Sequence, residues 1–291
     1  MRCGAVRGGD REVPVLLRAL ALSVSGLLGT VIAFILISGL AALLEGRGLG
    51  LLGSLWNPAG GRFGILPMIH ASVLLALSSL LLGWLLSLGC CCMLNGMAPR
   101  PLAALLMGCL RLMTAVPTVV YGFAAVFVLV PLIRGALGGT GFCWLAACLV
   151  LTLQGLPTMT FVMDGAVRSL VAQTSLTAAA LGMTPLECLS RVALPLAKRS
   201  MLSAAVLGLG RALGDALIPT MLAGNAIQFA LSPLSSMRTL TAHIALVLSS
   251  DIGGGEHLSL LLAGALLLLA CAAFSLAARH LSREASGDVR P

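Results

Sequence analysis

The chain has 291 residues, of which 59% are hydrophobic and 10% charged, and it carries a formal net charge of +8. Its mean hydropathy of +1.06 is far above that of soluble globular domains, so the composition excludes an ordinary soluble enzyme or binding module. The positive charge requires no nucleic-acid partner, because basic residues beside an anionic inner leaflet account for it.

Apolar runs long enough to cross a bilayer, about 20 residues of helix each, can be counted along the chain. They lack the alternation of a membrane barrel and are rich in Leu, Ala and Gly, so we expect membrane-spanning helices. The six predicted spans are Leu16–Leu44, Ile65–Leu94, Leu102–Ile133, Phe142–Met163, Met201–Leu222 and Leu258–Ala278.

The first run follows several arginines, as a cleavable secretion signal does, but its apolar stretch is roughly twice the 7 to 15 residues of such a signal. We therefore interpret it as a retained helix. With the N-terminus inside, twelve Lys and Arg residues fall on cytoplasmic segments and four on outer loops. This asymmetry predicts a multi-pass membrane protein with both termini in the cytoplasm.

The spans define the expected organisation of the chain. Residues 1–14 form a short cytoplasmic segment, residues 15–280 a transmembrane domain with a long cytoplasmic loop at about 164–200, and residues 281–291 a cytoplasmic tail. Pro117 and Pro157 lie inside the third and fourth spans, where a missing N–H frees the carbonyls of Met113 and Leu153. We expect hinges at both prolines.

Most of the nine cysteines lie in spans or at their ends, where a thiol behaves as a small apolar group. The four histidines show no ligand spacing and are interpreted as loop or interface residues. We accordingly expect no metal site, no cofactor and no catalytic residue.

The inner loop predicts two short helices around a bend. Thr174 or Ser175 can cap the first helix, and Gly182 can end it in the left-handed conformation. A capping box then opens the second helix, with Thr184 at the N-cap, Pro185 at the first helical position and Glu187 three residues after the cap.

The second helix is amphipathic and needs a partner. Its apolar side is opposite Arg191 and comprises Leu186, Leu189, Val192 and Ala193. One interpretation is an interfacial helix resting on lipid headgroups. The other is a docking element for a cytoplasmic protein, and the residue pattern does not separate the two.

The fifth span, GLGRALGDALIPTMLAGN, keeps two opposite charges in an apolar setting. Arg211 and Asp215 are four residues apart, so they are expected on one helix face, where they can partly neutralise each other. Charges inside a membrane helix mark a substrate or ion path by default. The alternatives are a buried structural bridge and a proton relay. An arginine with five fixed donors suits an oxyanion.

Small residues and a proline surround this charged pair. Gly208, Gly210 and Gly214 leave room for another helix or a solute. Pro219 cannot donate to the carbonyl of Asp215, so the backbone is expected to open at the charged turn. Broken helices at membrane depth usually line a cavity, which adds Pro219 to the predicted hinges.

The sequence contains no motif that would let this chain use ATP to drive movement of a substrate. The single lysine, Lys198, is preceded by Ala197 and followed by Arg199, so the chain contains no GxxxxGK[ST] phosphate loop. ATP would have to be handled by another polypeptide.

Four stretches in order resemble a known family. FGILPMIHASVLLALSSLLLGW, VPTVVYGFAAVFVLVPLIRG, LGMTPLECLSRVALPLA and GLGRALGDALIPTMLAGN are similar to the permease subunits of the bacterial phosphate ABC transporter, the Pst system, and closer to the PstC than to the PstA type. The resemblance covers about residues 63–280. It implies an all-α membrane protein with six transmembrane helices and the type I importer (MetI-like) permease fold.

The resemblance also implies partners and residue roles. The permease would pair with a second permease, a dimer of ABC ATPase subunits, a periplasmic phosphate-binding protein and the lipid bilayer. The stretch 178–196, with Gly182 and Pro195 at its turns, would seat in the ATPase. Arg211 and Asp215 match the Arg and acid of the family's RAxGE stretch. Two departures are Leu176, where the loop usually carries a glutamate, and Asp215, where the family has a glutamate.

We therefore expect the permease subunit of an importer for inorganic phosphate. Alternatives are a permease for sulfate, molybdate or tungstate, because one arginine does not distinguish these oxyanions, and a membrane scaffold or sensor that transports nothing. A membrane enzyme is less well supported, because no nucleophile, base and oxyanion donors cluster in the sequence.

Overall fold

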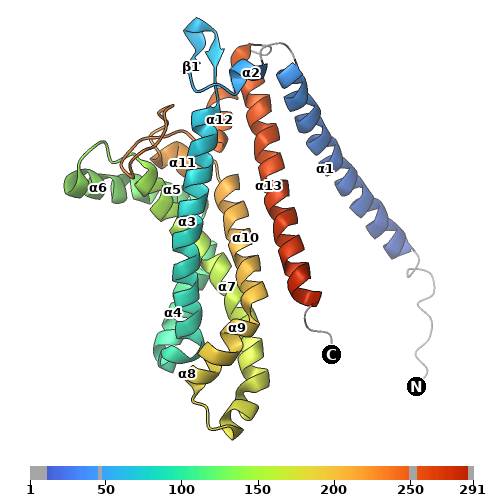
Figure 1. Ribbon diagram of the computed structural model, residues 1–291, viewed down its shortest axis with the longest axis vertical. Helices are drawn as coiled ribbons and strands as arrows, with labels where there is room; N and C mark the ends of the chain where they lie inside the picture. Colours follow the sequence, from blue (N-terminus) through green and yellow to red (C-terminus); the bar gives the residue numbers. More distant parts are fainter. Residues whose placement is uncertain (1–11, 45–47, 249–253, 288–291) are drawn as a thin grey trace.

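The computed structural model describes residues 12–44, 48–248 and 254–287, which are mainly helical, with one small hairpin and an irregular stretch at 223–239 (Figure 1). The elements are α1 (Glu12–Leu44), α2 (Gly48–Leu51), β1 (Trp56–Asn57), η1 (Pro58–Gly60), β2 (Arg62–Phe63), α3 (Leu66–Cys92), η2 (Met93–Met97), α4 (Arg100–Ala115), α5 (Thr118–Phe127), α6 (Leu129–Leu137), α7 (Trp144–Ala180), α8 (Pro185–Glu187), η3 (Cys188–Ala193), α9 (Leu194–Leu196), α10 (Lys198–Gly214), α11 (Leu217–Leu222), α12 (Leu240–Val247) and α13 (Gly255–Gly287).

The all-α membrane fold is confirmed. Five helices of the described chain are long and apolar enough to cross a bilayer, and a sixth is counted if α10 is joined to the short helices before it across a bend of 66°. Four predicted spans correspond to α1, α3, α7 and α13. The third and fifth are divided at Pro117 and at Asp215, where the sequence predicts a hinge and an opening of the backbone.

The central helix of the bundle is α7, which packs between α3 and α10. Met159 of α7 lies where the three helices meet, and its side chain occupies the space that a Cβ at Gly83 of α3 or at Gly208 of α10 would need. The expectation that Gly208 lets another helix come close is confirmed. Small residues at such crossings allow backbones to approach within membranes.

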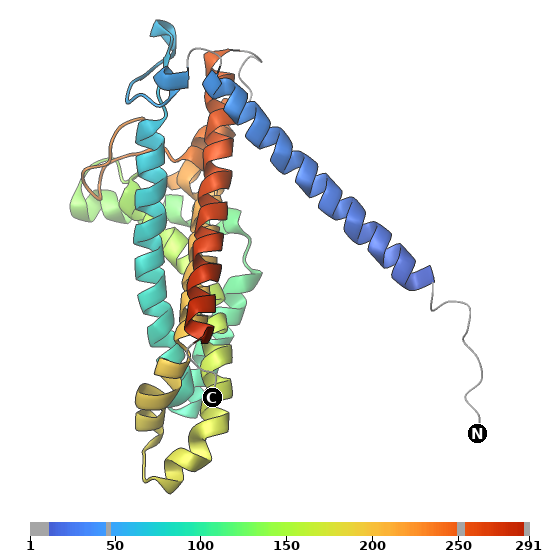
Figure 2. The same ribbon diagram turned by 45° about the vertical axis from the view of Figure 1, so that its right-hand side comes forward.

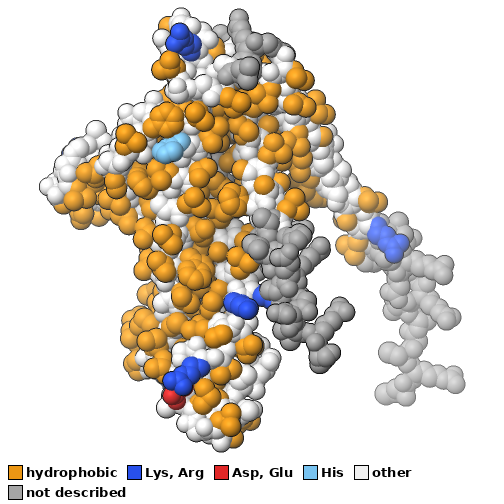
Figure 3. Space-filling view, in the orientation of Figure 1, with side chains coloured by type: hydrophobic (Ala, Val, Ile, Leu, Met, Phe, Trp, Pro, Cys, Tyr) orange, Lys and Arg blue, Asp and Glu red, His pale blue; other side chains and the backbone are white. Residues whose placement is uncertain are grey.

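The first helix stands apart from this bundle. Figure 2 shows α1 leaving α13 at a wide angle after a crossing near its C-terminal end, where Gly39 packs against Ala265. Most α1 side chains from Leu17 onward are exposed. In the space-filling view, hydrophobic side chains cover the middle of the visible face, and the few blue Lys and Arg patches lie at the hairpin tip, in the lower half and where α1 begins (Figure 3).

The bend formed by the end of α7 with α8, η3 and α9, residues 174–197, is called the elbow. The hairpin β1–β2 and the elbow occupy opposite ends of the molecule (Figure 1). Helix α1 begins, and helix α13 ends, on the side of the elbow rather than the hairpin. At the hairpin end, the ring of Trp56 meets the rings of Phe63 and His243 edge to face.

His243 corrects the expectation that the histidines are loop or interface residues. It lies on α12 with no exposed surface, and its Nε2 is 3.0 Å from the Ser259 hydroxyl of α13. Burial, together with the Arg238 guanidinium, lowers the pKa of the His243 imidazole from 6.5 to about 4. The side chain is therefore a neutral core residue that joins α12, α13 and the hairpin.

Stability of the hairpin end should depend on pH through His243. Because its pKa is lower in the folded chain, the unfolded chain takes up the proton first as the pH falls. Stability should be complete above about pH 6.5 and decline by up to about 3 kcal/mol toward pH 4. Thermal unfolding in detergent between pH 8 and 4 measures this. A His243→Gln variant should show a flatter profile, and identical profiles would contradict the assignment.

Candidate substrate passage and elbow

The charged turn of the fifth span is a helix break. Arg211 lies in the last turn of α10 and is exposed, α10 ends at Gly214, and Asp215 has extended backbone angles of φ −76° and ψ 122°. The Asp215 carboxylate turns toward the next helix, where its Oδ1 accepts a hydrogen bond from the backbone N–H of Ile218 at 3.0 Å. Asp215 therefore satisfies a backbone N–H in the first turn of α11, from the position before the N-cap residue Ala216.

This geometry is incompatible with the predicted pairing of Arg211 and Asp215. The two residues do not share a helix face, because Asp215 has left the helix. Within the described residues the single ion pair joins Arg191 and Glu187 of the elbow. The spacing of four residues led to the wrong expectation because it assumed a continuous helix. The Arg211 guanidinium is left without a carboxylate partner in the described chain.

The opening caused by Pro219 is confirmed. The carbonyl of Asp215, which the proline cannot bond, accepts a hydrogen bond from the Thr241 hydroxyl of α12 at 2.9 Å. Gly214, at the end of α10, faces open space, since a Cβ there would meet no atom within 4 Å. Arg211 thus lies beside the break between α10 and α11 rather than in a packed interface between helices.

A second break lies at Pro117, between α4 and α5. The carbonyl of Met113 accepts a hydrogen bond from the Tyr121 hydroxyl at 2.8 Å. Thr118, the first residue of α5, accepts one from the buried side-chain amide of Gln154 at 2.8 Å. Neither Tyr121 nor Gln154 was singled out in the sequence. Tyr121 could have been singled out, because it is the only tyrosine in the sequence and follows Pro117 closely.

The third predicted hinge is different. Pro157 is buried inside α7, and the helix runs through it without interruption from Trp144 to Ala180. Breaks therefore occur at Pro117 and near Pro219, while Pro157 lies within a continuous helix.

The elbow follows most of the predicted pattern. Gly182 has φ +73° and terminates α7. The Thr184 hydroxyl accepts from the Glu187 N–H at 3.3 Å, and Glu187 Oε2 accepts from the Thr184 N–H at 2.9 Å. The Thr184 N–H and hydroxyl both donate to the Glu187 carboxylate, and these two bonds hold the pKa of that carboxyl below its usual range. The capping box is confirmed, with Pro185 at the first helical position.

The start of the elbow was predicted wrongly. Thr174 and Ser175 cap no helix, because α7 continues through them to Ala180, and the Thr174 hydroxyl bonds back to the carbonyl of Leu170 at 2.8 Å. Threonine side chains make this backward bond inside helices as readily as they cap them. Pro195 lies in the short helix α9.

The apolar side of the second elbow helix is divided between two surroundings. Leu189 and Ala193 are buried against α7 and neighbouring helices, in a cluster with Met163 and Val167. Leu186 is instead 49% exposed, so the prediction of one continuous apolar side was wrong for this residue. It joins further exposed leucines around the bend, which we call the elbow patch: Leu176, Leu181, Leu186 and Leu196.

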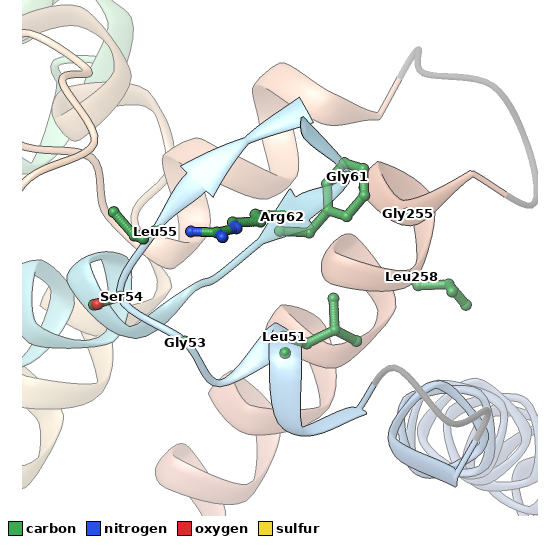
Figure 4. A pocket seen from close by; sticks show the side chains of 10 residues that line it. Leu51, Gly53, Ser54, Leu55, Gly61, Arg62, Gly255 and Leu258 are labelled. Atoms are coloured by element: carbon green, nitrogen blue, oxygen red, sulfur yellow. The ribbon is translucent and has the colours of Figure 1, made fainter. Parts of the chain in front are cut away.

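Two hollows are lined by residues other than those of the charged turn. One, of about 620 Å³, lies beneath the hairpin, and Figure 4 shows the Arg62 side chain extending across it toward Leu55. The other, of about 510 Å³, is an open apolar groove between α3, α5 and α7 that includes Tyr121. Neither hollow has Arg211 or Asp215 among its lining residues.

Comparison with known proteins gives consistent results. Residues 91–287 match the family described as binding-protein-dependent transport system inner membrane component. The chain is 33% identical to the probable ABC transporter permease protein YqgH of Bacillus subtilis, over 78% of this chain and 75% of that protein. It is 28% identical to the phosphate transport system permease protein PstC of Mesorhizobium japonicum, over 87% and 83% respectively.

A solved structure shares the fold. A chain of the MetNI methionine ABC transporter, determined in inward-facing conformations, superposes with a TM-score of 0.59 over 74% of this chain and 92% of that chain. At 16% sequence identity this likeness concerns the fold alone. The expected MetI-like arrangement is confirmed.

Proposed function

We propose that this chain, which belongs to the family of binding-protein-dependent transport system inner membrane components, is the permease subunit of an ATP-driven importer for inorganic phosphate. Family membership makes it a membrane component of an ABC transporter rather than an enzyme. The choice of phosphate is supported by its similarity to PstC permeases. Sulfate, molybdate and tungstate remain chemically related alternatives for the same kind of passage.

The observation that carries the proposal is the position of Arg211. Its guanidinium is exposed at the end of α10, beside Gly214 and the backbone opening, and has no carboxylate partner in the described chain. A guanidinium presents several N–H donors in a plane and binds tetrahedral oxyanions through two of them at once. An unpaired arginine at a break between membrane helices is therefore suited to receive a travelling oxyanion.

The elbow supplies the proposed connection to the energy source. Its exposed leucines and its rigid capping box form a shaped apolar surface, on which a dimer of ABC ATPase subunits would dock. A second permease would complete the passage, and a periplasmic phosphate-binding protein would deliver the anion at the hairpin end. This arrangement puts the elbow and both termini in the cytoplasm of a bacterial cell, with the chain in the inner membrane.

The proposed mechanism depends on the helix breaks at Pro117 and between α10 and α11. Closure of the ATPases on ATP would displace the elbow, which leads directly into α10. The movement would reach the break between α10 and α11, with Pro117 allowing α5 to follow, and would alternate access to Arg211. ATP hydrolysis itself would take place on the partner subunit.

Uptake of labelled oxyanions by the complex reconstituted in liposomes tests the proposal. ATP-dependent entry of labelled phosphate should require the phosphate-binding protein and should exceed the entry of labelled sulfate or molybdate supplied with the same binding protein. Transport of sulfate or molybdate in place of phosphate would overturn the choice of substrate. A complex that assembles and hydrolyses ATP but moves no oxyanion would overturn the transport proposal.

A further inference from the structure

A buried carboxylate lies at the elbow end of the bundle, outside the passage described above. Asp164 of α7 is only 6% exposed, although the sequence placed it at the start of a cytoplasmic loop. In the described chain no Lys, Arg or His lies within ion-pair distance of it. Its Oδ1 accepts a hydrogen bond from the side-chain amide of Asn95 at 2.7 Å, across 69 residues of sequence.

Asn95 occupies an unusual piece of backbone. It lies in η2, a π-helical turn that ends α3 and leads into α4, and its amide also donates to the carbonyl of Cys91 at 2.9 Å. The next residue, Gly96, has φ +157° and ψ −11°, which favours glycine. Turns of the π type are rare and occur often at functional sites.

The elbow reaches the same point. Its helix η3 is also π-helical, and Leu189 of η3 is 1% exposed. A Cβ placed on Gly96 would contact Leu189 Cδ2 at 3.7 Å, so the Leu189 side chain lies directly beside η2. Asn95 thus has the elbow on one side, through Gly96, and Asp164 of α7 on the other.

We propose that Asn95 and Asp164 form a clasp that couples the elbow to the turn between α3 and α4, and that both are positioning residues for transport. The inference rests on the proposed function. When the elbow is displaced, Leu189 pushes on η2, and the clasp makes η2 move together with α7. The α3–α4 turn then receives the same displacement as α7 and α10.

The choice of residues supports a role beyond stability. Burying a carboxylate costs desolvation free energy, and a well-packed apolar pair would stabilise the same contact without that cost. A hydrogen bond to a charged group is, however, strongly directional and short. It holds two irregular turns in one relative orientation, which apolar contacts do not specify as sharply.

The test compares ATP hydrolysis with transport in the reconstituted complex. Asn95→Leu removes the donor, so uptake per ATP hydrolysed should fall at least about tenfold while hydrolysis stays within about twofold of wild type. Asp164→Asn keeps an acceptor oxygen for Asn95 and should retain most of the coupling, whereas Asp164→Leu should lose it. Gln173→Leu, on the exposed side of α7, is the matched control and should behave as wild type.

Several results would overturn the clasp. They are wild-type coupling in Asn95→Leu, complete loss of coupling in Asp164→Asn, and parallel loss of hydrolysis and uptake in a fully assembled Asn95→Leu complex. If Asn95→Leu does not assemble, Asn95→Ser decides the question by the same criteria, because its short hydroxyl does not reach Asp164. The ratio is measured with whichever oxyanion the wild-type complex transports, so a wrong choice of phosphate leaves this test intact.

Discussion

Replacing Arg211 with alanine should reduce ATP-dependent phosphate uptake at least about 100-fold while the complex still assembles. A guanidinium that contacts an oxyanion through two charge-assisted hydrogen bonds contributes about 1.5 to 3 kcal/mol for each. Arg211 has no carboxylate partner in the described chain and lies beside the open end of α10. Its loss should therefore remove an anion contact without leaving a buried acid unpaired.

Two comparisons show whether this loss is specific to the passage. Arg211→Lys keeps the charge but loses the planar pair of donors, so uptake should be intermediate. Arg111→Ala removes another exposed arginine, on α4, and should leave uptake near wild type. Undiminished uptake in Arg211→Ala would remove the residue from the passage. So would a cysteine at position 211 that a water-soluble thiol reagent fails to reach in every state of the complex.

Local signals in the sequence predicted the elements that local interactions determine. Long apolar runs predicted the spans and the Thr184–Glu187 spacing predicted the capping box. Gly182 correctly marked a helix end, although the helix that ends there is α7 and not the separate short helix that was expected. The capping box and the helix end depend on residues within about one turn of each other, and each span depends on one continuous run of apolar residues. The helix break at the charged turn belongs to the same class, because Pro219 removes a bond to the carbonyl four residues earlier.

Contacts between distant segments were not predictable in this way. The freed carbonyl of Asp215 is satisfied by Thr241, and the Trp84 indole N–H donates to the carbonyl of Met201 at 3.1 Å. The buried carboxylate of Asp164 accepts its hydrogen bond from Asn95 of η2, 69 residues earlier in the chain. No periodicity records which helices are neighbours, so an aspartate at the end of an apolar run was assigned to a loop.

The divided surface of the elbow has the same origin. Leu186 and Leu189 are three residues apart and look equivalent in a helical pattern, yet only Leu189 faces α7. The π-helical turn from Cys188 to Ala193 changes the angular spacing of side chains, and the bundle covers only part of the apolar stripe. The uncovered part is what remains for a partner.

Replacing Leu181 and Leu186 together with aspartate should abolish binding of the ATPase subunit to the permease. The two side chains are 75% and 49% exposed, and neither supports the internal core. Each leucine buried in an interface contributes about 1.5 to 3 kcal/mol, and a carboxylate in its place adds a desolvation cost. The dissociation constant should rise at least about 100-fold, measured by co-purification and by titration of labelled ATPase in detergent.

A charge at an exposed leucine far from the elbow provides the matched control. Leu231, in the segment between α11 and α12, is 91% exposed, and Leu231→Asp should leave ATPase binding unchanged. The double variant should keep the unfolding temperature of the isolated permease, because the buried face of Leu189 and Ala193 is untouched. Normal ATPase binding by this stable double variant would show that the elbow patch faces something else, such as lipid headgroups, and would return the elbow to the interfacial interpretation.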